Sequence, residues 1–465
     1  MTLRRLTGVD AAFLAAERPG QPLHMMGLLL LDVSTVPGGY RFDDFVDFLA
    51  RRLPLLPPLR RRLVEVPGGL GLPLWVEETE IDLDLHVRRA AVPSPGGPRE
   101  LSVMASEMLE RPLDRSRPLW EMALVEGVEG DRVALLAKLH HAMMDGLAGI
   151  ALMASLFGTT PEIPDPPEAP RKIAERVPTP VELLVRSLPW LLDQPGRATR
   201  AGLRTAWGAL RRGRSRRGDA EAPALEVPRS WLNVETTSRR AVAYQRLPLE
   251  AMRAVGRPLG ASLNDVLLAA VAGALHRYLD DHGVLSERAL VAGVPLAVRE
   301  QGDERANAFS SVSVGLATDL EDPAARLVAI RDAMAARKGE RGSSLGEDIA
   351  AWAEVPPPRV FSLIADLYLN LHLAERIDPV CNLVISSVPG PPESLYLAGA
   401  RLEGIYPLGP IYSGLALNVT AIGCGNSMDI GLVACRGRMP DLWDLADAIP
   451  PALDELAEAV SKRCA

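Results

Sequence analysis

Residues 133–157 constrain the fold more than any other part of this chain. They read VALLAKLHHAMMDGLAGIALMASLF: an apolar run leads into two adjacent histidines, an Asp-Gly pair follows, and a nearly uncharged segment leaves. The run DRVALLAKLHH and the preceding RPLWEMALVEGV predict the two strands of a hairpin, with GVEGD as its turn. Ionisable side chains within so much apolar sequence require either buried partners or a chemical role.

Strand geometry separates the two histidines, because successive side chains of a strand point to opposite faces. His140 then shares a face with Ala134, Leu136 and Lys138, whereas His141 shares the other with Val133, Leu135, Ala137 and Leu139. We therefore predict that His141, at the end of the strand with a buried face behind it, is the candidate for chemistry. His140 is expected to hydrogen-bond to the surrounding structure instead.

The chemistry that suits His141 is general base catalysis, since an imidazole titrates near neutral pH. Asp145 lies four residues further on and either orients His141 or pairs with an arginine elsewhere. Gly146 permits a tight exit into a predicted helix at residues 147–157. Two histidines and an aspartate also fit a metal site or a satisfied core pair, but a metal needs further ligands at suitable spacing, and the sequence suggests none.

Length and composition indicate an ordinary globular protein. A chain of 465 residues predicts two domains of about 200 residues each. The net charge of -8 argues against general nucleic-acid binding. No apolar run reaches the roughly 18 residues needed to span a bilayer, and the first residues lack a signal-peptide pattern, so we expect an intracellular protein. The four cysteines, none in a CxxC pair, are expected to be buried thiols: Cys381, Cys424, Cys435 and Cys464.

Three regions follow along the chain. Residues 1–160 mix short strands with helices predicted at 42–53 and 100–113, and residues 229–465 form a second unit. The second unit has predicted helices at 261–279, capped by Ser262, at 321–338 and at 441–461, and a two-stranded ribbon that turns at GCGNS. Strands and helices do not alternate regularly, so the pattern favours the α+β class over a doubly wound parallel sheet.

Residues 161–228 differ in composition from both units. A proline-rich piece is followed by the amphipathic VELLVRSLPWLL, and eight arginines without an acidic residue lie between Gln194 and Gly218. We interpret this region as a linker between the two units. It is either a solvated connection or a segment that lies on a membrane or lipid surface, with a contact to coenzyme A phosphates as a third alternative.

Several blocks of the sequence together resemble one family. HHAMMDG fits the HHxxxDG pattern of coenzyme A-dependent acyltransferases, a superfamily that includes condensation domains. VDAAFLAAE, PLHMMGLLLLD, PLDRSRPLWEMALVEGV, ASLNDVLLAAVAGALHRYL, VPLAVRE and NLVISSVPGPP occur in the order seen in bacterial wax ester synthase/diacylglycerol acyltransferases. This resemblance implies two subdomains of chloramphenicol acetyltransferase type, with mixed sheets and a channel at their interface.

The resemblance also implies an activity and roles for individual residues. His141 would act as general base while an alcohol attacks a long-chain acyl-CoA, so that diacylglycerol gives triacylglycerol and a fatty alcohol gives a wax ester. Asn264 would stabilise the oxyanion, and Asp145 would be structural, with Arg299 as its partner. No cofactor or metal is implied beyond the acyl-CoA substrate, and we expect a cytoplasmic protein that contacts the inner membrane or lipid bodies peripherally.

The sequence departs from the family pattern in two places, and some residues keep an alternative role. Ser386-Ser387 stands where the family commonly has Ser-Asn, and GCGNS stands where it has Ser-Tyr-x-Gly. These departures leave the acid-base residues intact, but the resemblance does not define the shape of a channel wall at these positions, and so does not define the substrate. Trp120 either packs in the core or lines the channel. Asn264 and Asp265 either serve the reaction centre or cap a helix.

Other functions were weighed against acyl transfer to lipid alcohols. The same fold would also suit a polyketide-derived or sugar hydroxyl acceptor, or a catalytically silent lipid-binding protein. Residues 342–346, GSSLG, match the G-x-S-x-G elbow of serine hydrolases, but that elbow needs a strand before it. The preceding RDAMAARKGER is charged and helical, so we reject this motif.

Overall fold

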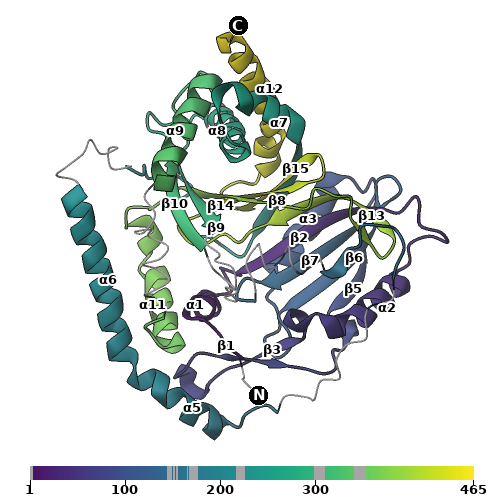
Figure 1. The fold of residues 1–465 in the computed structure, drawn as a ribbon, viewed down its shortest axis with the longest axis vertical. Helices are drawn as coiled ribbons and strands as arrows, with labels where there is room; N and C mark the ends of the chain where they lie inside the picture. The colour runs from purple at the N-terminus through teal and green to yellow at the C-terminus, as the bar shows by residue number, and fades with distance from the viewer. Residues whose placement is uncertain are drawn as a thin grey trace.

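The computed structural model describes residues 4–143, 149, 152, 155–164, 166, 176–215, 226–297, 309–339, 352 and 354–464. These residues form two six-stranded sheets and a small three-stranded sheet (Figure 1). Both large sheets mix parallel and antiparallel pairs. The α+β class with mixed sheets is thereby confirmed.

The first large sheet contains the strand that ends at the histidines. Its order is β12-β13-β2-β7-β6-β5. β7 lies between β2 and β6, and the predicted hairpin of β6 and β7 is confirmed. The strands are β2 (His24–Asp32), β5 (Val87–Ala91), β6 (Trp120–Val128), β7 (Arg132–His140), β12 (Tyr396–Leu397) and β13 (Ala400–Leu408).

The second large sheet has the order β10-β9-β11-β14-β15-β8. The predicted ribbon of β14 and β15 is confirmed, with Gly425 at positive φ in its turn. Four helices gather beyond this sheet, at the top of Figure 1: α7 (Leu249–Gly256), α8 (Leu263–Asp281), α9 (Pro323–Gly339) and α12 (Leu442–Cys464). The strands are β8 (Arg240–Pro248), β9 (Val291–Ala297), β10 (Phe309–Gly315), β11 (Leu383–Val388), β14 (Leu417–Cys424) and β15 (Ser427–Cys435).

Helix α8 forms as its sequence predicts. Ser262 is the N-cap of the helix, and its hydroxyl accepts a hydrogen bond from the Asp265 backbone N–H. The Asp265 carboxylate in turn accepts a hydrogen bond from the Ser262 backbone N–H. This reciprocal capping box satisfies amides that the first turn leaves free. Most of the residues that follow are apolar and fully buried against α9 and α12, so α8 is the central helix of this half.

One pair of strands lies in a different unit from the one expected for it. β12 and β13 come from residues 396–408, within the predicted second unit, yet they pair with β2 in the first sheet. The composition of β13 explains this position. Leu402 and Ile405 belong to one buried cluster and Tyr406 and Leu408 to the other, so β13 needs apolar neighbours on both faces.

A buried carboxylate bridges the two large sheets at β13. Asp429 of β15 is 0% exposed and pairs with Arg246 of β8 at 2.7 Å. It also accepts the Ile405 backbone N–H of β13 at 2.9 Å. Arg246 in turn donates to the Glu403 backbone oxygen. The charge that Asp429 brings into the interior is therefore compensated by partners on both sheets.

The region expected to be a linker contains two helices, α5 (Pro180–Leu192) and α6 (Gln194–Ser215). α6 runs along one side of the molecule beside α11 (Pro358–Asn370) (Figure 1). The remaining helices are α1 (Gly8–Ala16), α2 (Phe42–Arg52) and α3 (Pro98–Glu110), with 3-10 turns η1 (Leu53–Leu55), η2 (Pro57–Arg60), η3 (Pro67–Gly69), η4 (Leu83–Leu85), η5 (Arg257–Leu259) and η6 (Leu373–Glu375). The small sheet comprises β1 (Arg4–Arg5), β3 (Arg61–Val64) and β4 (Leu74–Glu77).

Within the described ranges, no single helix is both long and apolar enough to cross a bilayer. The segments Leu249–Leu259 and Leu263–Asp281 meet that criterion only as a pair, bent by 102°. Their apolar residues belong to the largest buried cluster of the protein.

Replacing Asp429 tests the fastening of the two sheets. Asp429→Ala leaves Arg246 and the Ile405 N–H without their acceptor, and we expect it to lower the free energy of unfolding by about 2–3 kcal/mol. Urea denaturation followed by circular dichroism measures this loss. Asp378→Ala is the matched control, because Asp378 is fully exposed and lies 3.9 Å from Arg229. Equal stability of both variants would contradict the role of Asp429.

Candidate active site

The two faces of β7 enter different buried clusters, as strand alternation predicts. Ala134 and Leu136 belong to the largest cluster, which includes α8 and the second sheet. Val133 and Leu135 belong to the cluster of α2, β12 and β13. Lys138, on the His140 face, is fully buried and donates to the Met108 and Arg111 backbone oxygens while pairing with Glu121. The strand is thus apolar on both faces because both are covered.

His141 is the first residue after β7 and lies in the turn that follows. Its backbone N–H donates to the Leu23 oxygen at 3.1 Å, which ties the turn to the strand beside it. Its half-buried ring stacks on Phe13 of α1, with ring centroids 4.3 Å apart and an interplanar angle of 26°. Phe13 therefore limits the rotation of the imidazole about its side-chain bonds.

His140 is almost completely buried, at 1% exposure, and lies in a cluster of charged groups. Its Nδ1 accepts the Ala142 backbone N–H at 3.0 Å, which leaves the proton of the neutral ring on Nε2. That nitrogen lies 3.6 Å from a Glu17 oxygen. His24 Nε2 approaches the other Glu17 oxygen at 2.9 Å, and Arg115 pairs with Glu17 at 2.7 Å.

Glu17 is ionised at the centre of this cluster. Burial alone would raise its pKa, but the interactions with His140 and His24 outweigh burial and hold the pKa well below its ordinary value. Burial lowers the pKa of His24, against the opposing effect of Glu17. Arg115 supplies a permanent positive charge that compensates this carboxylate. The backbone of Ala142 fixes His140 through Nδ1, and Nε2 faces the Glu17 carboxylate at 3.6 Å.

The remaining predicted residues fall into three groups. Asp145, Gly146 and Arg299 lie outside the described residues. Asp265 caps α8 through the Ser262 backbone and hydroxyl, at 2.8 and 2.7 Å. Asn264 is half-buried in the first turn of α8.

Trp120 is a core residue, 1% exposed. Its indole N–H donates to the Leu59 backbone oxygen at 2.7 Å, and its ring stacks on His86 at 4.3 Å. Ser386 and Ser387 are half-buried in β11, where they pair with Thr420 and Ala421 of β14. Their predicted place in a channel wall stays a prediction.

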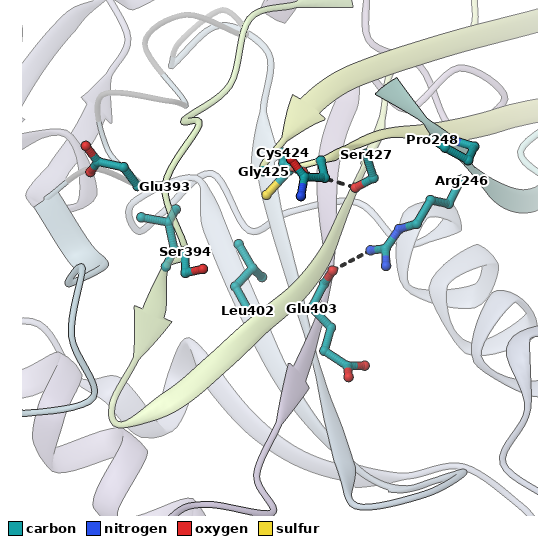
Figure 2. Close-up of a pocket in the computed structure, with 11 residues that line it drawn as sticks. Arg246, Pro248, Glu393, Ser394, Leu402, Glu403, Cys424, Gly425 and Ser427 are labelled. Atoms are coloured by element: carbon teal, nitrogen blue, oxygen red, sulfur yellow. Dashed lines mark hydrogen bonds between the residues drawn. The ribbon is translucent and has the colours of Figure 1, made fainter. Parts of the chain in front are cut away.

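A pocket of about 520 Å³ opens beside the GCGNS turn. The turn residues Cys424 to Ser427 line it together with Arg246, Glu393 and Glu403 (Figure 2). Leu402, which lines the pocket, lies opposite Leu31 of β2, and Leu31 lies opposite Val133 of β7. Val133 is seven residues before His140 along β7. At about 3.3 Å per residue this places the pocket roughly 23 Å from the histidines. Burial raises the pKa of Cys424 to about 11, so the pocket holds a neutral thiol and no thiolate nucleophile.

Comparison with known proteins places the chain in a family. The wax ester synthase/diacylglycerol acyltransferase catalytic domain matches residues 6–267, and the WS/DGAT C-terminal domain matches residues 306–457. A Mycobacterium tuberculosis protein named "Putative diacyglycerol O-acyltransferase Rv1760" is 34% identical over 98% of this chain and 90% of its own. The wax ester synthase/diacylglycerol acyltransferase of Marinobacter aquaeolei VT8 superposes with a TM-score of 0.70 at 30% identity, covering 98% of this chain and 100% of that one.

The first condensation domain of the calcium-dependent antibiotic synthetase shares the fold, with a TM-score of 0.58 at 16% identity over 100% of this chain and 98% of that chain. The chain thus belongs to the wax ester synthase/diacylglycerol acyltransferase family and is an acyltransferase. The expected two-subdomain architecture is confirmed by this likeness.

Two residues of the site were not identified from the sequence. Phe13 and Glu17 both come from VDAAFLAAE, a block that supported the family resemblance but received no role there. Their sequence distance from His141 hides the contact, which arises because β2 follows α1 and pairs with β7, placing His24 opposite His140. The presence of VDAAFLAAE among the family-like segments was the one sequence signal that could have linked these residues to the site.

The role of Glu17 in fixing His140 predicts a pH-dependent stability. Glu17→Gln is expected to cost about 1–3 kcal/mol of unfolding free energy at pH 7, because the group that Arg115 pairs with loses its negative charge. The folded-state pKa lies below the ordinary 4.5, so this contribution is present above that value and is lost as the pH falls towards the folded-state pKa. Denaturation curves at several pH values measure it. Glu65→Gln is the control, since Glu65 is an exposed partner of the same arginine at 3.5 Å, and a pH-independent difference between wild type and Glu17→Gln would refute the account.

Proposed function

We propose that this protein transfers a long-chain fatty acyl group from coenzyme A to the hydroxyl of diacylglycerol or of a fatty alcohol, with His141 as general base. The observation that carries the proposal is the separation of the two histidines. His140 is buried, with its Nδ1 bonded to the Ala142 N–H and its Nε2 3.6 Å from the Glu17 carboxylate, whereas His141 is half-buried just after β7, with its ring stacked on Phe13. Family membership supports the choice of an acyl donor and a lipid alcohol.

The reaction needs one proton to move twice. His141 removes the proton from the attacking hydroxyl while its oxygen forms a bond to the thioester carbon. The tetrahedral oxyanion then collapses, the carbon–sulfur bond breaks, and the thiolate of coenzyme A takes the proton back from His141. An ester and free coenzyme A result, with no acyl-enzyme and no cofactor.

The supporting residues keep the roles that the family resemblance suggests. Asn264 is proposed to donate to the oxyanion, which is the usual function of a side-chain amide at such a site. Asp145 and Arg299 are proposed to form the ion pair that fixes the loop after His141, and Gly146 to allow its turn. Asp265 supports Asn264 by capping the same helical turn.

Peripheral contact with a lipid surface is part of the proposal. Both substrates carry long acyl chains, and α6 has six arginines without an acidic residue. Such a segment is attracted to anionic lipid headgroups. We therefore propose that residues 161–228 lie at a membrane or lipid-body surface.

The alternative acceptors differ in polarity. The pocket beside GCGNS carries charged and hydroxyl-bearing side chains among apolar ones, and these could bind a polyketide-derived or sugar group. However, its distance of roughly 23 Å from the histidines along the strand is too large for a hydroxyl within it to reach His141. The pocket therefore gives the polar acceptors no advantage, and lipid alcohols remain the proposed acceptors.

Replacing His141 tests the proposed base. Purified enzyme with palmitoyl-CoA and either dioleoylglycerol or hexadecanol is expected to release free coenzyme A, and His141→Ala to lower turnover about 10²–10⁴-fold with the fold retained. Thiol release is measured with a chromogenic disulfide. His372→Ala is the matched control, because His372 is an exposed histidine paired with Glu235. Full activity of His141→Ala would exclude the mechanism.

The acceptor is tested separately. A panel of diacylglycerols, fatty alcohols, sugars and aromatic alcohols is offered with one acyl-CoA, and products are separated by thin-layer chromatography. We expect turnover of the lipid alcohols and at most trace products from the polar acceptors. Preferred acylation of a sugar or aromatic hydroxyl would replace the proposed acceptor while leaving the base intact.

A further inference from the structure

Helix α11 has its apolar side turned to solvent. Apolar residues recur at positions i, i+3, i+4, i+7 and i+11, a stripe that faces the core in an ordinary surface helix. In α11 and the residue after it, 43–62% of each of these residues is exposed: Val360, Leu363, Ile364, Leu367 and Leu371. No residue of α11 is fully buried. The apolar stripe therefore requires a covering that the described chain does not supply.

The polar side of α11 holds the helix on the protein. Arg18 pairs with Asp366 at 2.6 Å and donates to the backbone oxygen and the hydroxyl of Ser362, at 2.8 and 2.9 Å. Ser362 also donates to the Ala15 oxygen at the end of α1. Asp366 and Ser362 are one helical turn apart, so a single arginine fixes the face of α11 opposite the apolar stripe. The outward orientation is thus built into specific contacts.

A second apolar stripe lies on α5, which touches the same turn η3 as α11. Its members repeat at i, i+4, i+7 and i+11 and are 51–80% exposed: Val181, Val185, Leu188 and Leu192. The opposite side of α5 is buried through Leu183 and Trp190. Single exposed apolar residues are common on protein surfaces, but exposed apolar stripes on two neighbouring helices indicate an interaction site.

Arginines gather beside these stripes, although the chain as a whole carries -8. Asp193 balances part of their charge by pairing with Arg197 and Arg200. Arg5 donates to the Arg186 backbone oxygen of α5, and the charges of Arg186 and Arg197 lie close enough to oppose that of Arg5. α6, joined to α5, adds arginines without acidic residues. Apolar stripes beside arginines complement a surface with negative headgroups over acyl chains. Two copies of this face would instead bring like charges together.

We propose that the stripes of α5 and α11 form one docking face for an anionic phospholipid surface. This rests on the proposed function only in that lipid substrates would be met there. α11 is packed on α1, the helix whose Phe13 stacks on His141, so a lipid surface bound by α11 lies next to the element that holds the catalytic ring. The face lies mainly on α11, in the C-terminal half, and extends lipid contact beyond residues 161–228.

Flotation of the full-length protein with vesicles tests the docking face. Vesicles of phosphatidylglycerol and phosphatidylcholine are expected to carry wild-type protein, and vesicles of phosphatidylcholine alone to carry less. Replacing Leu363, Ile364 and Leu367 by Gln keeps helix-forming side chains but removes the stripe, and the bound fraction is expected to fall about tenfold. Replacing Val181 and Val185 by Gln on α5 is expected to weaken binding in the same direction.

The matched control replaces three exposed apolar residues outside the docking face by Gln: Val103, Val284 and Leu285. Its binding should equal that of wild type, and melting curves by circular dichroism check the folding of every variant. Wild-type binding by the α11 variant, or no vesicle binding by wild type, would overturn the proposal. So would a dimer, detected by light scattering, that the α11 variant converts to monomer. Coenzyme A release from palmitoyl-CoA with detergent-dispersed hexadecanol is measured in parallel without vesicles, and its absence in wild type would count against the proposed function and not against the docking face.

Discussion

The alternation of side chains along β7 is the constraint on which the site depends. Both faces of this strand are buried, so a shift of one residue would exchange two differently packed clusters and is strongly disfavoured. Because of the same alternation, the His140 side chain lies in the Glu17 cluster, whereas the His141 side chain lies at the turn. Two identical adjacent side chains thereby receive different surroundings, and a pair that resembles a metal site becomes one structural and one proposed catalytic residue.

The position of β7 depends in turn on contacts made far from it in sequence. β13 returns from the C-terminal half to pair with β2, and Asp429 ties β13 to β15 and β8. α1 adds Phe13 and Glu17 on the side of the histidines and provides, through Arg18, the attachment of α11. The proposed lipid-docking face and the proposed base therefore share one supporting helix.

Local sequence signals predicted several helices, strands and turns. Long-range contacts determined how these elements are arranged, which the sequence did not predict. The β6–β7 hairpin, the ribbon at GCGNS and the Ser262 cap of α8 follow from turn and capping chemistry within a few residues. The pairing of β13 with β2 joins residues such as Arg401 and Asp32, 369 positions apart, and Glu17 meets Arg115 from 98 positions away. No local pattern encodes these contacts. No prediction was made for α11, and its outward orientation could not have been predicted locally, because its apolar stripe is typical of a core-facing helix and the contact with Arg18 is long-range. The roles of Asp145, Asn264 and Arg299 remain predictions.

Chemical rescue tests most directly whether His141 is the base and His140 a structural residue. Glycine is placed at residue 140 or 141 in separate variants, and coenzyme A release is measured with increasing imidazole at pH 7. The account predicts that imidazole restores turnover in His141→Gly, since only a base is missing there, and does not restore it in His140→Gly, where a buried cluster is disrupted. Rescue of His140→Gly alone, or equal rescue of both variants, would contradict the assignment of His141 as the base.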